Sequence, residues 1–430
     1  MPRPQLAEFM RRMEPGSVAV IPAAPEAMRS NDTQYRYRQD SDFYYLTGFD
    51  EPESIAVIAP SRDPDKFTLF VRPRDPEQET WVGRRAGVEG AKERHGADAA
   101  FPVSEFRDKL AELLNGATNV YYRLGVRRDI DDVLIKQLGE MRLRGRLYTA
   151  PDSITDPSAV LGEMRLVKSD EEIELMQRAA DIAAEAHVLA MQQARPGMYE
   201  YEIEALIEYH FRKSGAAAPA YGTIVGGGAN ATILHYVTND APLRDGDLLL
   251  IDAGAEYQGY ASDITRTFPV SGRFSAAQRD IYEAVLAAQV ACVEMVRPGV
   301  TWDDLNERAV RMLTESMVRL GLLEGDVDKL VEEKTYRRFF MHGVGHFLGL
   351  DVHDAGRYKL NGASRPLQPG TVITVEPGIY VAPDADGVPD KYRGIGVRIE
   401  DDVLVTPDGH RVLTDAAPKQ VEEIEALTAR

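Results

Sequence analysis

The sequence predicts an α/β (α+β) protein of two domains, an amino-terminal α/β domain over residues 1–160 and a second mixed domain over residues 161–430. Three observations carry this prediction. The chain has 430 residues, more than the usual domain of about 100–200 residues. Strand-like and helical segments alternate through its first third, and an internal repeat occupies the rest. Because 44% of the residues are hydrophobic, the chain can bury a sizeable core.

The first domain is expected to alternate strands with helices. Short apolar runs separated by Pro, Gly and Asp predict strands, and longer periodic segments predict helices. The strands are expected at residues 17–21, 43–46, 54–58, 67–71 and 119–122, and the helices at 103–115 and 130–143. A stretch rich in Pro, Asp and Ser over residues 151–157 then marks the approach to the boundary. After it, Ser169-Asp-Glu-Glu172 has the capping-box pattern that opens a helix.

Composition excludes several classes of partner. Lys plus Arg number 50 and Asp plus Glu number 69, which leaves a net charge of −19; nucleic acid and anionic membranes are therefore not expected as partners. No stretch reaches the ~18–20 apolar residues of a membrane span, and the first residues lack the apolar core of a signal peptide. The single cysteine, Cys292, falls at helical spacing with apolar residues and is expected in the core. We expect a cytoplasmic protein.

The internal repeat organises the second domain. The segments Pro242–Gly254 and Pro366–Gly378 share Pro-Leu-x-x-Gly, five further residues, an acid, one residue and Gly. Each segment follows a helix that ends in Arg-Pro-Gly, at residues 195–197 and 297–299. Two half-domains of helices followed by strands are therefore predicted. Each half supplies one histidine and two acids in the same order: His235, Asp252 and Asp263 from the first, and His346, Glu376 and Glu400 from the second.

The four acids predict a cation site. In an antiparallel hairpin centred between Tyr257 and Gln258, Asp252 and Asp263 would lie opposite each other with Cβ atoms about 4.5–5.5 Å apart. Two carboxylates at that distance repel unless a proton or a cation lies between them. With Glu376 and Glu400 in matching places, a pair of divalent ions is the simplest answer.

Three histidines cluster near the second half of the repeat. His342 and His346 have the spacing of a zinc-binding helix, but the intervening Gly-Val-Gly and the missing Glu favour an extended, closely packed segment. His353 follows seven residues later. At least one of the three is expected to be a ligand, whereas four histidines outside this cluster and the repeat are expected to be structural, namely His95, His187, His210 and His410.

These motifs resemble those of the bacterial Xaa-Pro aminopeptidases, the aminopeptidase P group of metallopeptidase family M24. The resemblance rests on Ile251-Asp-Ala-Gly-Ala-Glu-Tyr-Gln-Gly-Tyr-Ala-Ser-Asp-Ile-Thr-Arg-Thr-Phe268, Met341-His-Gly-Val-Gly-His346, Thr374-Val-Glu-Pro-Gly-Ile-Tyr380 and Arg393-Gly-Ile-Gly-Val-Arg-Ile-Glu-Asp-Asp402. It extends to the first domain through residues 37–49 and 81–85. Gly345 and Phe347 beside His346 depart from the family pattern.

The resemblance implies a pita-bread catalytic domain over residues 161–430, preceded by an aminopeptidase P amino-terminal domain. It places Asp252 and Asp263 on one metal and His346 and Glu376 on the other, with Asp263 and Glu400 bridging both. An oxygen-rich ligand set of this kind suits Mn²⁺. Two metals would share a hydroxide that attacks the peptide carbonyl. Glu376 would shuttle the proton, and His353 and His235 would face the substrate. His342, Arg398 and Tyr380 would shape a proline pocket.

The expected reaction is hydrolysis of the bond between an amino-terminal residue and a following proline. The expected assembly is a homodimer or homotetramer. An Xaa-Pro dipeptidase (prolidase) shares the fold and ligands and is the principal alternative. Methionine aminopeptidases normally lack a first domain of this kind, and creatinase-like relatives lack the metal site. A non-catalytic pita-bread binding protein and a purely structural oligomer subunit are the alternatives from other classes.

Overall fold

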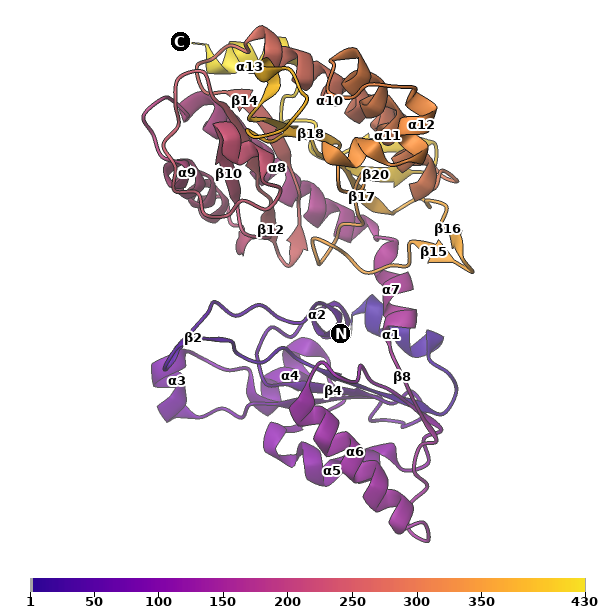
Figure 1. Ribbon diagram of the computed structural model, residues 1–430. Coiled ribbons are helices and arrows are strands. Elements are labelled where there is room, and N and C mark those ends of the chain that lie inside the picture. The colour runs from indigo at the N-terminus through magenta and orange to yellow at the C-terminus, as the bar shows by residue number, and fades with distance from the viewer. Residues whose placement is uncertain (1–2, 430) are drawn as a thin grey trace. The chain divides into compact units, whose positions relative to one another are not determined.

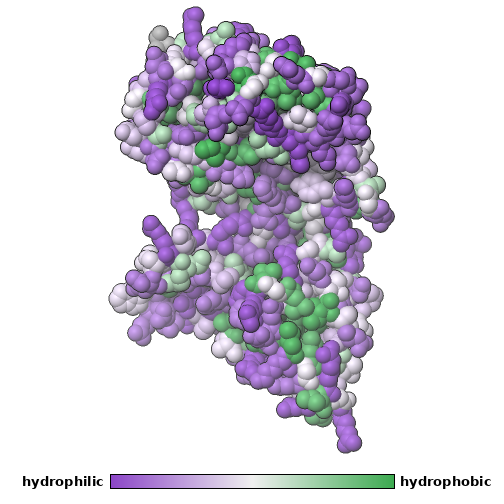
Figure 2. All heavy atoms as spheres, in the orientation of Figure 1, coloured by the Kyte–Doolittle hydropathy of each residue, from purple (hydrophilic) through white to green (hydrophobic). Residues whose placement is uncertain are grey.

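The computed structural model describes residues 3–429 and divides the chain into two compact units, Met1–Met164 and Arg165–Arg430. Both units mix helices and strands (Figure 1). Helix α7 (Ser158–Leu166) carries the chain across this division. Within the described residues, no helix is long and apolar enough to cross a membrane. Hydrophilic residues cover most of the face drawn in Figure 2, as the net charge of −19 leads one to expect.

The first unit is built on a six-stranded mixed sheet with the strand order β6-β5-β4-β1-β7-β8. Its strands are β1 (Ser17–Pro22), β4 (Ile55–Ile58), β5 (Phe67–Val71), β6 (Ala99–Pro102), β7 (Asn119–Tyr121) and β8 (Ser153–Thr155). A separate hairpin joins β2 (Met28–Ser30) to β3 (Thr33–Gln34). The helices are α1 (Pro4–Arg12), α2 (Ser41–Thr47), α3 (Pro76–Val82), α4 (Gly87–His95), α5 (Phe106–Leu114) and α6 (Arg128–Leu143). The core beneath α5 and α6 is formed by apolar residues of these two helices and of β1, β4 and β7.

One predicted strand of this unit is wrong. Residues 43–46, which the aromatic run predicted as a strand, lie in helix α2. The Asp40 side chain accepts a hydrogen bond from the backbone N–H of Phe43 and caps the helix, and Gly48 ends it in the left-handed conformation with φ 61°. Because aromatic residues favour strands and four residues are too few to show a period, the capping residues were the better signal.

The second unit surrounds three small sheets and two hairpins with paired helices. Its helices are α8 (Asp170–Gln193), α9 (Glu200–Lys213), α10 (Ala276–Met295), α11 (Trp302–Arg319), α12 (Val327–Glu332) and α13 (Val421–Thr428). The strands of the first half are β9 (Ala218–Pro219), β10 (Ile224–Gly227), β11 (Leu248–Asp252), β12 (Ala255–Tyr257), β13 (Tyr260–Ala261) and β14 (Thr265–Pro269). Those of the second half are β15 (Lys359–Leu360), β16 (Ala363–Ser364), β17 (Val372–Val375), β18 (Gly378–Val381), β19 (Ile395–Arg398), β20 (Asp401–Thr406) and β21 (Gly409–Val412).

The predicted repeat appears as two halves with the same order of elements. Helices α8 and α9 pack together and precede the sheet β10-β11-β14, and α10 and α11 pack together and precede the sheet β17-β20-β21 (Figure 1). Ser169 caps α8 with the predicted capping box, and Gly197 and Gly299 follow α8 and α10 with positive φ. Cys292 is fully buried in α10, as predicted. One apolar core runs through both halves, so the two sheets are held at fixed positions within this unit.

Candidate active site

The two acids of the first half lie close together, but not in the predicted register. The hairpin turns at Gln258 and Gly259, both with positive φ, rather than between Tyr257 and Gln258. Asp252 therefore pairs with Thr265, and Asp263 lies two residues nearer the turn. The prediction that the two aspartates face each other directly is wrong, because a turn of two positive-φ residues is favoured in hairpins and moves the register by one position on each strand.

Tyr221 brings the two carboxylates together. Its hydroxyl oxygen lies 2.6 Å from Oδ1 of Asp252 and 2.5 Å from Oδ1 of Asp263. The hydroxyl has one proton and can donate it to only one of the two carboxylates at a time. The second close oxygen pair therefore needs another positive charge, a proton or a cation, to be stable.

The second half contributes its ligand candidates from the neighbouring sheet. Glu376 directly follows β17, and Glu400 lies between β19 and β20. His346 lies on an extended segment that is bonded along β17: Thr374 N–H donates to His346 O over 2.9 Å, and Glu376 N–H donates to Val344 O over 2.8 Å. The extended segment was predicted from its interleaved glycines. At Gly345 an added Cβ would lie 2.0 Å from the carbonyl oxygen of Thr374, so the segment packs too closely for a side chain there.

Acids of both halves meet at His346. Its Nε2 lies 3.4 Å from Oδ2 of Asp263 and 3.6 Å from Oε1 of Glu376. Potential ligand atoms of Asp263, His346 and Glu400 all lie within 4.8 Å of one another. The Glu400 carboxylate also accepts a hydrogen bond of 2.6 Å from the Thr265 hydroxyl. Four carboxylates and one imidazole thus converge from two sheets.

The electrostatics of this cluster favour a bound cation. Burial raises the pKa of Asp252, raises the pKa of Glu376 to about 7, and raises the pKa of Glu400 well above its usual range. Burial lowers the pKa of His346, but the hydrogen bond and charge of Asp263 outweigh it and raise the value to about 9. Buried carboxylates that hold protons near neutral pH are short of positive charge. The donor set fits divalent metal ions, which would replace those protons.

A cavity of about 930 Å³ opens on this cluster. All five predicted metal ligands line it, and so do His235, His342, His353 and Arg398. The rings of His346 and His353 meet edge to face with centroids 4.4 Å apart. Tyr380 lies behind this lining and reaches it through hydrogen bonds. The remaining histidines contact other groups: His187 bonds Ala253 O, His210 bonds Glu185, His410 bonds Val296 O and His95 packs on Phe49.

A chain of hydrogen bonds orients His342. Arg398 Nη1 donates to the Tyr380 hydroxyl over 3.1 Å, and that hydroxyl lies 2.8 Å from His342 Nε2. His342 Nδ1 lies 2.8 Å from Gly343 O, which can only accept. His342 therefore has its proton on Nδ1 and accepts from Tyr380 at Nε2. Burial and the charge of Arg398 lower the pKa of His342 to about 4, which keeps this imidazole neutral.

Three residues that contact the cluster were missed by sequence reasoning. The Tyr221 hydroxyl contacts Asp252 and Asp263, and the Thr265 hydroxyl contacts Glu400. The Thr374 hydroxyl oxygen accepts a hydrogen bond of 3.0 Å from the backbone N–H of His346. Thr265 and Thr374 could have been found, because each lies two residues from a predicted ligand and a strand places such residues on the same face. No local signal marks Tyr221, which lies 31 residues before Asp252.

Comparison with known proteins finds a matching family model for each of the two units. Residues 174–407 match the model of metallopeptidase family M24, and residues 4–121 match that of the aminopeptidase P amino-terminal domain. The Xaa-Pro aminopeptidase of Escherichia coli is 49% identical over 98% of this chain and 97% of its own. That of Haemophilus influenzae is 47% identical over 97% and 94%, respectively.

Solved structures agree over nearly the whole length. A Pseudomonas aeruginosa aminopeptidase superposes with a TM-score of 0.97 and 51% identity, covering 99% of this chain and 96% of its own. A zinc-substituted aminopeptidase P from E. coli in complex with product superposes with a TM-score of 0.96 and 48% identity, with the same coverage. The predicted combination of an α/β first domain with a pita-bread domain is thereby confirmed.

Proposed function

This chain belongs to metallopeptidase family M24, and from that premise we propose that it is an Xaa-Pro aminopeptidase whose metal site is the buried cluster described above. It removes the amino-terminal residue of peptides that have proline in second position. The observation that carries the proposal is the convergence of four carboxylates and His346 from both half-domains on one cavity. The relatives named Xaa-Pro aminopeptidase favour this activity over the prolidase alternative.

The proposed ligand set has two parts. Asp252 and Asp263 would hold one ion and His346 and Glu376 the other, with Asp263 and Glu400 as shared ligands. Bound divalent ions supply Lewis acidity, which activates water and polarises the carbonyl group of the substrate. Manganese is the proposed native metal, because the donor set has four carboxylates and no thiolate.

The surrounding residues are assigned by where they lie. His353 and His235 line the cavity, where an imidazole can donate a hydrogen bond to the oxyanion that develops on the substrate. Glu376 is the proposed proton shuttle between water and the leaving proline nitrogen, since its side chain lines the cavity beside the other proposed ligands. His342, Arg398 and Tyr380 form the hydrogen-bonded wall proposed for the proline side.

Two features would select peptides with a free amino terminus and proline in second position: the charge of the site and the absence of an N–H group on the bond to proline. The carboxylate cluster attracts the free ammonium group of a peptide. An Xaa-Pro bond has no N–H on its nitrogen, so a site that recognises it holds the substrate by other groups. Three finer predictions belong to this proposal and rest on resemblance and composition: Mn²⁺ as the native metal, a homodimer or homotetramer, and a cytoplasmic location.

Hydrolysis of Arg-Pro-Pro and of Arg-Pro by the metal-stripped protein, with and without Mn²⁺, tests the proposal. Release of arginine from the tripeptide on addition of Mn²⁺ is the expected result. Activity on the dipeptide alone would make the protein a prolidase. Failure to cleave either peptide, with Mn²⁺ bound, would return the non-catalytic binding protein as the better interpretation.

A further inference from the structure

The two half-domains meet along β14 in a ladder made largely of side chains. At its centre, Thr265 and Glu400 form an isolated antiparallel bridge, in which Glu400 N–H donates to Thr265 O over 3.1 Å. On one side, Asp263 N–H donates to the Asp402 carboxylate over 3.0 Å. On the other, the Thr267 hydroxyl donates to Arg398 O over 3.0 Å. We call this ladder the seam.

The seam determines how far apart the acids of the two halves lie. Asp263 belongs to the first half and Glu400 to the second, and both take part in the seam through their own backbone. One backbone bridge forms the seam, and the side chains of Thr265 and Arg398 also cross it. Further contacts reach the backbone of the seam itself.

Arg266 provides those contacts. Its side chain is fully buried, and Nη1 donates to Thr265 O over 2.9 Å and to Glu400 O over 2.5 Å. Nη2 donates to the Asp401 carboxylate over 2.7 Å and to Ala417 O over 2.7 Å. The planar guanidinium group thus bonds both strands of the seam at the position of Glu400 and ties them to the segment before α13.

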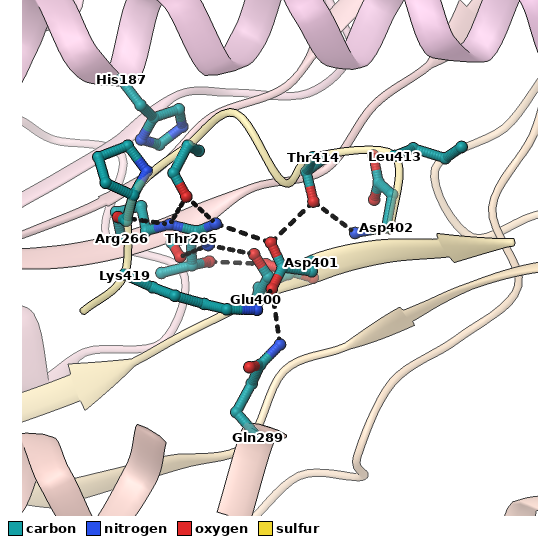
Figure 3. Close-up of polar contacts among 12 residues, drawn as sticks. His187, Thr265, Arg266, Gln289, Glu400, Asp401, Asp402, Leu413, Thr414 and Lys419 are labelled. Carbon is teal, nitrogen blue, oxygen red and sulfur yellow. Dashed lines mark hydrogen bonds and ion pairs between the residues drawn. The ribbon is translucent and has the colours of Figure 1, made fainter. Parts of the chain in front are cut away.

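Asp401 completes the arrangement from the second half. Besides Arg266, its buried carboxylate accepts from Gln289 Nε2 and from the Thr414 hydroxyl, each over 2.8 Å, and pairs with Lys419 (Figure 3). Neither Arg266 nor Asp401 is among the described residues that line the cavity. Arg266 contacts the proposed ligand through the backbone oxygen of Glu400 rather than through its carboxylate.

We propose that Arg266 and Asp401 are positioning residues that set the spacing between the metal ligands of the two half-domains. The inference rests on the proposed metal site. A buried ion pair is weak evidence for stability by itself, and many other interactions join the halves in the shared core. The direct bond from Arg266 to Glu400 O gives this pair a specific effect on the ligand that bridges both metals.

Equilibrium titration with Mn²⁺ tests the proposal, with free metal measured by a competing chelator and the bound pair observed by electron paramagnetic resonance. The variants are Arg266→Met and Asp401→Asn; the second keeps the volume of the side chain and an oxygen acceptor, which limits its effect on folding. Each is expected to bind at least one Mn²⁺ about 10- to 100-fold more weakly than the unsubstituted protein, the usual effect of losing a partner behind a ligand. The spin-coupled signal of the pair should weaken in parallel.

Leu313→Ala is the matched control. Leu313 is fully buried in α11, and none of the hydrogen bonds given above for the seam comes from that helix, so its truncation is expected to lower the unfolding temperature and to leave Mn²⁺ affinity unchanged. If Asp401→Asn and Arg266→Met behave like this control, the two residues are merely structural and the inference is overturned. If the unsubstituted protein binds no Mn²⁺, the proposed function fails instead, and the two failures are told apart.

Discussion

Arg398 Nη2 donates a hydrogen bond of 2.6 Å to Oδ2 of Asp252, a residue 146 positions earlier in the chain. The pair joins the two halves on the cavity side of the seam, and Arg398 also donates to Tyr380 and to Thr265. One guanidinium group therefore orients a proposed metal ligand and the hydrogen-bonded wall beside it.

Replacing Arg398 by methionine is expected to lower kcat/KM for Arg-Pro-Pro by about 100-fold or more, comparable to loss of one preorganised donor. The loss arises because Asp252 and Tyr380 lose a shared donor. Steady-state kinetics at saturating Mn²⁺ measure the effect. Arg393→Met is the control, since Arg393 is partly exposed and bonds Ala385 O and Asp390; an equal loss in both variants would contradict the prediction.

His353→Ala and His235→Ala are each expected to reduce kcat by about 10²- to 10³-fold while Mn²⁺ stoichiometry stays unchanged. Both imidazoles line the cavity without being proposed ligands. Rate measurements and metal analysis on the same preparations separate the two effects. The control is His210→Ala, which removes a histidine bonded to Glu185. Loss of metal from His353→Ala would mean that this residue is a ligand.

Mn²⁺ affinity is expected to rise as pH rises from about 6 to about 9. In the metal-free protein, burial raises the pKa of Glu376 to about 7, and Asp263 raises that of His346 to about 9. Both groups hold protons at pH 6 and must release them to bind metal. Calorimetry in two buffers of different ionisation enthalpy measures the released protons. A heat of binding independent of the buffer would contradict this account.

Lys168→Met is expected to destabilise the protein by about 3–5 kcal/mol, because it leaves a buried carboxylate short of a partner. Lys168 Nζ lies 2.9 Å from Asp354, and both side chains are 1% exposed; Arg165 pairs with the same carboxylate. Urea unfolding of the metal-free protein at pH 7 measures the change. Lys391→Met, which removes an exposed partner of Asp280, should leave the free energy of unfolding close to that of the unsubstituted protein.

The same pair predicts a loss of stability in acid. Although burial raises the pKa of Asp354, the charges of Lys168 and Arg165 outweigh it and lower the value below that of an ordinary aspartate. The folded state therefore gains stability above the unfolded pKa of about 3.9, and this gain disappears as pH falls through the lower folded value. The unfolding free energy of Lys168→Met should depend less on pH in this range than that of the unsubstituted protein.

Local patterns were sufficient for most of the elements that the sequence analysis predicted. The capping pair Ser169 and Glu172 correctly predicted the start of α8, and short apolar runs correctly predicted β1, β4, β5 and β7. The exception, α2, shows the limit of reading a short aromatic run without its caps. The matching acids of the two repeats line the same cavity. They do so because the two repeats place these acids at corresponding strand ends of the two half-domains.

By itself, the sequence determined the two-part organisation and the internal repeat, and with the family resemblance it also identified the acids and histidines that line the cavity, since residue types, their spacing and the comparison of segments are all visible in the sequence. Tertiary structure alone decided that Asp252 pairs with Thr265, that Tyr221 lies between two aspartates, and that Arg266 bonds the backbone of Glu400. The first is the register of one hairpin, and the contacts of Tyr221 and Arg266 join residues between 31 and 134 positions apart in the chain. Their geometry depends on strand register and on the packing of the two halves, which no local pattern encodes.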